Sequence, residues 1–169
     1  ITGMFALGIT DKINLIGVVP WMHTEASQGQ LRRVSGISDV SLFIKAQAFH
    51  ITAGPGKLAF NPTIGISSPV SNYLEDYAPF SLGMGCLDLT LRGNLQYKLN
   101  MGVYLRGTAA YQLRGNSKIE RDYYYTTHGI YSDEVDVPNA LTYTATLGAW
   151  LLKNSLNIDV TYDGLTSYG

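Results

Sequence analysis

Apolar and polar residues alternate one by one through long stretches of the chain. In the segment 87–98 every odd position is apolar, Gly or Tyr, and every even position is polar. The segments 101–114 and 156–163 repeat this pattern, and 40–48 and 141–152 follow it more loosely. A period of two residues predicts β-strands in which one face of the sheet is apolar.

The two faces of these predicted strands differ in charge. The apolar face carries no charged residue, whereas the opposite face carries nine: Asp39, Lys45, Asp88, Arg92, Lys98, Arg106, Arg114, Asp159 and Asp163. A charge that faces lipid costs about 2–4 kcal/mol near the middle of a bilayer. We therefore expect the apolar face to contact lipid and the nine charged residues to line a wet lumen.

The connections between strands alternate in length. Weaker strands are expected at 4–10, 13–23 and 58–67, with short turns at 11–12, 99–100 and 153–155 and a somewhat longer one at 50–56. Long connections cover 24–38, 68–85 and 115–140. Such alternation is typical of outer-membrane barrels, which have short periplasmic turns and long extracellular loops. The pattern predicts a single all-β domain over 1–169, an antiparallel transmembrane β-barrel with at least eight strands in view.

A soluble β-protein is the competing interpretation. Sandwiches and lipocalin-like barrels also alternate, but they turn the apolar face into a core. Strand length favours the membrane, because about 9–11 residues span a bilayer when tilted, whereas soluble strands average about 5–6 residues. Burial of Leu89, Leu105 and Val160 beneath a second sheet would exclude the membrane barrel.

Composition narrows the class further. Charged residues make up 15% of the chain, below the roughly 25% of soluble domains, yet the mean hydropathy is only +0.03. The longest apolar stretch, 15–22, contains Gly17 and Pro20 and is too short for a spanning helix. The net charge of −1 gives no sign of a nucleic-acid partner, and the single Cys86 excludes an internal disulfide. No signal peptide is visible and both ends read as strand, so we expect an internal portion of a longer, processed protein.

Two segments resemble one family of barrels. The sequence GISDVSLFIKA at 36–46 and the sequence PTIGISSP at 62–69 are similar to consecutive strands of the outer-membrane family named for the meta-pathway of phenol degradation. That family is related in style to outer-membrane transporters of fatty acids and aromatic hydrocarbons. The resemblance implies a larger barrel of about twelve strands, a bacterial outer-membrane location, and uptake of small hydrophobic or aromatic compounds.

The sequence contains no pattern that points to catalysis or to a cofactor. Its histidines are His23, His50 and His128, each at a strand end or in a loop. Neither a Gly-x-Ser-x-Gly elbow nor a His-Glu-x-x-His motif is present. We predict no catalytic residue and no cofactor. The acidic residues 133, 134 and 136 could hold calcium through oxygen ligands, but a solvated loop tip is the favoured interpretation, so no metal site is predicted.

Tyrosines gather in the longest connection. Tyr123, Tyr124, Tyr125 and Tyr131 lie among charged residues of the segment 115–140. Exposed tyrosines supply binding area at low entropic cost, so they are candidates for binding a solute or a partner. The alternative is that they pack the loop onto the barrel rim.

The leading functional hypothesis is a porin-like channel or transporter for small molecules in the outer membrane of a Gram-negative bacterium. Its luminal charges would set selectivity, and Arg92 and Arg106 could face each other across a hairpin. The second hypothesis is a non-transporting barrel, a structural or interaction subunit of a larger cell-envelope complex with protein partners. In that case the luminal charges would pair with one another and fill the interior.

Overall fold

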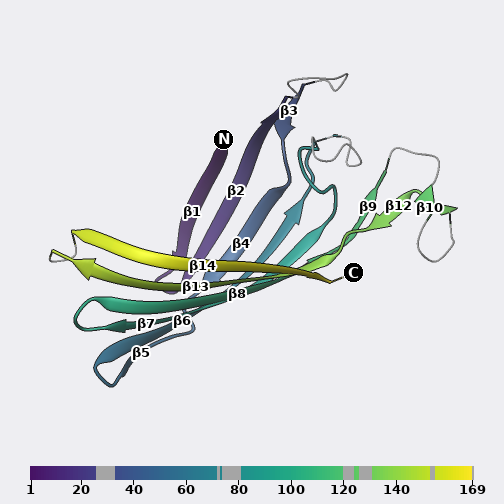
Figure 1. Ribbon diagram of the computed structural model, residues 1–169. Coiled ribbons are helices and arrows are strands. Elements are labelled where there is room, and N and C mark those ends of the chain that lie inside the picture. Colours follow the sequence, from purple (N-terminus) through teal and green to yellow (C-terminus); the bar gives the residue numbers. More distant parts are fainter. Residues whose placement is uncertain are drawn as a thin grey trace.

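The computed structural model describes residues 1–25, 33–71, 73, 81–119, 124–125, 131–152 and 155–168. These residues form an all-β protein dominated by one antiparallel sheet of ten strands (Figure 1). The main path of the sheet contains β1 (Thr2–Thr10), β2 (Ile13–Thr24), β4 (Val40–Ala46), β6 (Gly56–Ser68), β7 (Asp88–Leu99), β8 (Val103–Arg114), β13 (Asn139–Leu151) and β14 (Leu156–Tyr168). No helix long and apolar enough to cross a bilayer occurs among the described residues.

The sheet is a meander in which each strand pairs with the next strand of the main path. The order is β1-β2-β4-β6-β7-β8-β13-β14, while β3 (Val34–Ile37) pairs with β2 and β5 (Phe49–Ala53) pairs with β6. Figure 1 shows a strong twist, with β1 and β2 running steeply across the view and β13 and β14 nearly level. In the described part of the chain the sheet is open, with β1 and β14 at its two edges.

All eight expected strands are present, and the predicted antiparallel all-β class is confirmed. The turn predicted at 50–56 is wrong, because β5 occupies most of it and pairs with the first residues of β6. Phe49, Ile51 and Ala53 alternate with His50 and Thr52, but this short alternation is hard to see beside the sequence Gly54-Pro55-Gly56. The connection itself is only Gly54-Pro55, where Gly54 has a φ of +57°.

Two small ribbons stand outside the main sheet. The strand β9 (Asn116–Lys118) pairs with β12 (Glu134–Asp136), and β10 (Tyr124–Tyr125) pairs with β11 (Tyr131–Ser132). Both lie within the connection 115–140, which the sequence predicted to be a long loop. The pairing of β9 with β12 extends beyond the ends of β8 and β13 and adds no strand to the main sheet (Figure 1).

Aromatic rings cover glycines on neighbouring strands. In the register of the sheet, Phe43 is opposite Gly65 and Tyr143 is opposite Gly164. A Cβ added at Gly65 would lie 2.0 Å from Cδ1 of Phe43, and one at Gly164 would lie 2.2 Å from Cζ of Tyr143. Each ring therefore occupies the space that a side chain would fill. Since a slip of one residue turns every side chain to the other face, such pairs help to fix the register.

Candidate functional site

The strand register sorts the side chains of the main sheet onto two faces. One face, called the apolar face here, aligns Ile64 with Leu91 and Leu89 with Leu113. It continues through Leu147 and Val160 and carries no Asp, Glu, Lys or Arg in the strands of the main path. The opposite face, called the polar face, carries the residues in between. The sequence alternation therefore persists across neighbouring strands.

The apolar face is exposed. Leu89, Leu105 and Val160 have 37%, 56% and 75% of their surface accessible. The buried hydrophobic side chains of the described residues lie elsewhere, on the polar face or in the connections: Tyr73, Leu82, Cys86, Tyr104, Ala110, Ile119 and Ala140. This distribution is the reverse of a soluble sandwich, in which the apolar face is the buried one.

Eight of the nine charged residues expected in a lumen lie on the polar face. They are Lys45, Asp88, Arg92, Lys98, Arg106, Arg114, Asp159 and Asp163. The ninth, Asp39, lies in the bend between β3 and β4. There the hydroxyl of Tyr73 and the backbone N–H of Met84 donate to its carboxylate, the latter over 3.0 Å. Asp39 thus ties the segment 81–87 to the end of the sheet.

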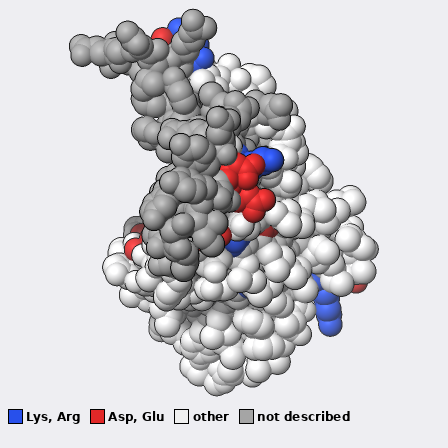
Figure 2. All heavy atoms as spheres, turned by 90° about the vertical axis from the view of Figure 1, so that its right-hand side faces the viewer, with Lys and Arg blue, Asp and Glu red and all other residues white. Residues whose placement is uncertain are grey.

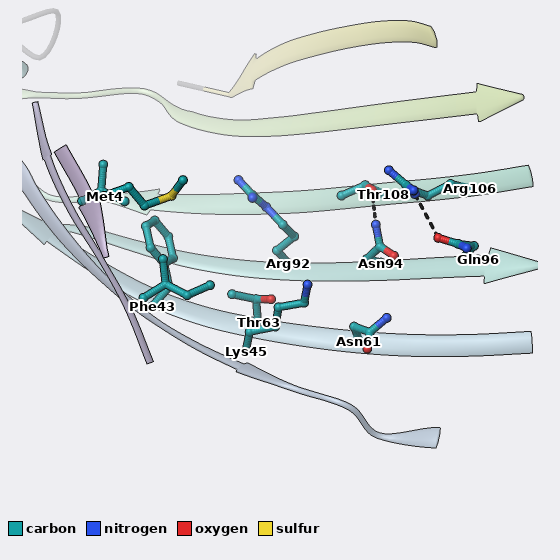
Figure 3. Close-up of a pocket in the computed structure, with 12 residues that line it drawn as sticks. Met4, Phe43, Lys45, Asn61, Thr63, Arg92, Asn94, Gln96, Arg106 and Thr108 are labelled. Atoms are coloured by element: carbon teal, nitrogen blue, oxygen red, sulfur yellow. Dashed lines mark hydrogen bonds between the residues drawn. The ribbon is translucent and has the colours of Figure 1, made fainter. Parts of the chain in front are cut away.

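A hollow of about 510 Å³ lies on the polar face (Figure 3). Its lining comes from strands as far apart in the sheet as β1, with Met4, and β8, with Thr108. The sheet therefore curls around the hollow. Lys45, Arg92 and Arg106 are the charged residues that line it.

Cross-strand rows build the floor of the hollow. In the first row Thr63 is opposite both Lys45 and Arg92. The next row aligns Asn61, Asn94 and Thr108, and the Asn94 amide donates a 2.8 Å hydrogen bond to Thr108. In the third row Nε of Arg106 donates a 3.2 Å hydrogen bond to Gln96. Three cations and several amides thus share one wall. Asn61 and Thr63 could not be assigned to a face from the sequence, because the alternation in 58–67 is too weak.

Two acidic residues of the polar face, Asp88 and Asp159, have partners outside the hollow. Nε of Arg114 lies 3.5 Å from Oδ2 of Asp88, and both side chains are largely buried. Asp159 accepts hydrogen bonds of 3.0 Å from the hydroxyl of Tyr104 and from the amide of Asn157. Arg114 thus balances the charge of Asp88, and neutral donors hold the Asp159 carboxylate; none of these side chains lines the hollow.

The expected meeting of Arg92 and Arg106 across their hairpin is wrong. The register places Ala110 opposite Arg92 and Gln96 opposite Arg106. The two arginines share the polar face and the hollow but occupy different rows, separated by the row of Asn94. Arg106 stacks instead on Tyr104, with Cζ 5.4 Å from the ring centroid.

The tyrosine candidates fall largely outside the described residues. Tyr123 lies outside them altogether, and for Tyr124, Tyr125 and Tyr131 the structure describes only the backbone of β10 and β11. A binding role for these side chains stays a prediction.

The acidic residues near β12 form local pairs. Nζ of Lys118 lies 3.1 Å from Asp133, and Asn116 donates a 3.2 Å hydrogen bond to Glu134. The hydrogen bond from Lys118 lowers the pKa of the Asp133 carboxyl. Figure 2 shows acidic and basic groups side by side on this end of the molecule, above a surface with few charges. Over the described ranges, no three His, Cys, Asp or Glu side chains are grouped to hold a metal ion.

The candidate site is therefore a curled polar face with a cationic hollow, backed by an exposed apolar face. No protein-family model and no curated protein sequence matches this chain.

Proposed function

We propose that this chain forms the wall of a β-barrel in a bacterial outer membrane and that the barrel passes small solutes. The apolar face contacts lipid, and the polar face lines the aqueous interior. The observation that carries the proposal is the exposure of an uncharged apolar face, at Leu89, Leu105 and Val160.

Physical chemistry favours lipid as the neighbour of this face. Monomeric soluble proteins seldom expose contiguous apolar patches of more than about 300–600 Å². Here large apolar side chains are exposed on every strand of the main path from β1 to β14, including Leu147 and Leu151 on β13. The strands β2, β7 and β8 have 12 residues each, and β6, β13 and β14 have 13. Such strands are long enough to cross a bilayer when tilted.

The hollow favours a barrel that passes solutes rather than one whose interior is closed by its own side chains. Lys45 and Arg92 line it without an ion pair among the described residues. Charged groups that line a water-filled path tune ion and solute selectivity. The similarity of the segments 36–46 and 62–69 to outer-membrane transporter-like barrels adds support for small hydrophobic or aromatic solutes.

A non-transporting barrel subunit, with partners in the cell envelope, is the second candidate. The pair of Asp88 with Arg114 and the hydrogen bonds of Asp159 favour it, because they fill part of the polar face with paired side chains. The interior of a small barrel, of about eight strands, can be filled by its own side chains.

Site-directed fluorescence in lipid vesicles tests the membrane assignment. Single cysteines are introduced at Leu95 and at Asn94, adjacent residues on opposite faces of β7, in a Cys86→Ser background. We expect a label at 95 to be quenched by lipids with brominated acyl chains and a label at 94 to be quenched by aqueous iodide. Equal quenching of both labels by iodide would reject contact of the apolar face with lipid.

Solute flux separates the two candidate functions. Vesicles that contain the inserted protein should release entrapped small solutes and show single-channel steps in planar bilayers. If the labels at 95 and 94 are quenched as expected but no conductance is measured, transport is rejected and the structural subunit is favoured.

A further inference from the structure

The hollow on the polar face has two chemically different walls. At one end its lining is apolar and consists of Met4, Ile16, Val18 and Phe43. Lys45, Thr63 and Arg92 follow in the middle, and amides and Arg106 lie at the other end (Figure 3). The apolar end and the cations are close neighbours, because Phe43 and Lys45 lie two residues apart on the same face of β4.

The charge of the hollow is unbalanced. Lys45, Arg92 and Arg106 line it, and no carboxylate does. Across the described residues, neither Lys45 nor Arg92 takes part in an ion pair or a side-chain hydrogen bond, while Asp88 and Asp159 are held by other partners. The hollow therefore presents two free cationic groups to whatever enters it.

The register places these two cations around one position. Lys45 and Arg92 are both opposite Thr63, on the strands that flank β6. Neighbouring strands lie about 4.7–4.9 Å apart, so both long side chains can reach an anion above Thr63. The guanidinium of Arg92 can donate two parallel hydrogen bonds to a carboxylate, and the hydroxyl of Thr63 can donate a third.

We propose that the hollow binds a small organic anion in which a carboxylate is attached to an apolar group. The carboxylate lies between Lys45 and Arg92, and the apolar group packs on Phe43, Ile16 and Met4. This proposal names a solute class for the proposed function and rests on it for the solute's route to the hollow.

Both parts of the ligand are needed to match both walls. A strongly hydrated inorganic anion would leave the apolar end in contact with water and gain nothing from it. A neutral ligand of the same shape would cover the cations without pairing them, at a desolvation cost. Only a ligand with an anionic head and an apolar body satisfies the arrangement.

Equilibrium binding of benzoate tests the proposal. The purified protein is kept in maltoside micelles, which contain no carboxylate or phosphate, and binding is measured by calorimetry. Benzamide supplies the same shape without charge, and acetate supplies the charge without the ring. We expect benzoate to bind at least about tenfold more tightly than either, a difference of about 1.4 kcal/mol.

Matched variants locate the site. Arg92→Gln and Lys45→Gln should each weaken benzoate binding about fivefold to tenfold, in line with the loss of one charge-assisted hydrogen bond. Lys57→Gln removes the same charge from the polar face at a position outside the lining of the hollow, and it should leave the affinity unchanged. Met4→Thr, at an exposed position on β1, should weaken binding of benzoate but not of acetate.

Equal affinities for benzoate and acetate would overturn the role of the apolar wall, and equal affinities for benzoate and benzamide would overturn the role of the cations. Loss of binding in Lys57→Gln to the same extent as in Arg92→Gln would overturn the location. Failure of the proposed function would be detected by different measurements, namely the lipid-quenching and conductance experiments. A protein that inserts and conducts without preferring benzoate rejects this site alone.

Discussion

The ring of Tyr104 on β8 lies over Gly148 on β13, and its hydroxyl donates a 3.0 Å hydrogen bond to Asp159 on β14. The ring can reach across β13 only because Gly148 has no side chain. Tyr104 is among the few buried hydrophobic residues of the described chain. One residue thus ties three strands together on the polar face.

A side chain at position 148 should disturb this contact. A Cβ there would lie 2.5 Å from Cζ of Tyr104 and 2.8 Å from Cβ of Asp159. We expect Gly148→Val to lower the free energy of unfolding by about 1–3 kcal/mol, the usual cost of overpacking. Urea denaturation in detergent, followed by tryptophan fluorescence, measures the change. Gly107→Val is the matched control, because a Cβ at Gly107 meets nothing within 4 Å. An equal loss of stability in both variants would contradict the role of Tyr104.

The ion pair of Asp88 with Arg114 should contribute measurably to stability. Its side chains are only 15% and 13% exposed, and the distance between Oδ2 and Nε is 3.5 Å. Removal of one partner leaves a largely buried charge alone, so Arg114→Met should destabilise the fold by about 1–3 kcal/mol. Asp88→Leu combined with Arg114→Met should cost less than the sum of these two changes made singly. For comparison, Arg33→Met breaks an exposed pair with Glu25 and should leave the unfolding midpoint unchanged. Additive costs at 88 and 114 would refute the coupling.

The proposed lipid contact predicts opposite tolerance of charge on the two faces of β6. Ile64 lies on the apolar face and Asn61 on the polar face, where it lines the hollow. In lipid vesicles Ile64→Lys should cost about 2–4 kcal/mol, whereas Asn61→Lys should cost far less. Equilibrium unfolding of both variants in vesicles supplies the measurement. Similar costs at both positions would remove support for a lipid-facing surface.

Cys86 should resist thiol reagents while the protein is folded. The thiol is buried, and burial raises its pKa, with smaller contributions from the nearby Asp88 and Asp39 carboxylates. Because the thiolate is the reactive form, alkylation by iodoacetamide between pH 7 and 9 should be much slower in the folded protein than in urea. Mass spectrometry follows the modification. Equal rates in the two states would show that Cys86 is accessible.

The β9–β12 ribbon should loosen in acid. Lys118 lowers the pKa of Asp133, so the pair contributes stability above the usual carboxyl value of 3.8 and loses it as the pH falls through the lower folded value. The amide of Ile119, which donates to the carbonyl of Asp133, reports this change by hydrogen exchange. Protection of that amide should decline below about pH 3.8. In Lys118→Gln this dependence on pH should disappear; its persistence would point to another group.

Much of the sheet could be predicted from alternation, and the limits of that approach are physical. In β7, in β8 and in the first eight residues of β14 polar residues are flanked by apolar ones or Gly, so strand and face follow together. Phe49–Ala53 repeats the pattern too briefly to be told from a turn. Met4 and Ile16 lie on the polar face although they are apolar, so only the pairing of strands reveals their place in the hollow. Spacing along the chain likewise cannot show that Gln96, not Arg92, is opposite Arg106, because this depends on the register that the turn at 99–102 imposes.

The free margins of the sheet, β1 and β14, have a consequence for the membrane insertion that the proposed function requires. On its outer side each margin presents backbone N–H and C=O groups that pair with no strand of the described chain. Hydrocarbon offers no substitute for water at such groups. If the apolar face is immersed, the two margins must first find strand partners, either each other or strands from elsewhere. Pairing of the two margins would then have to precede insertion. A variant that blocks this pairing would remain at the membrane surface with its secondary structure already complete.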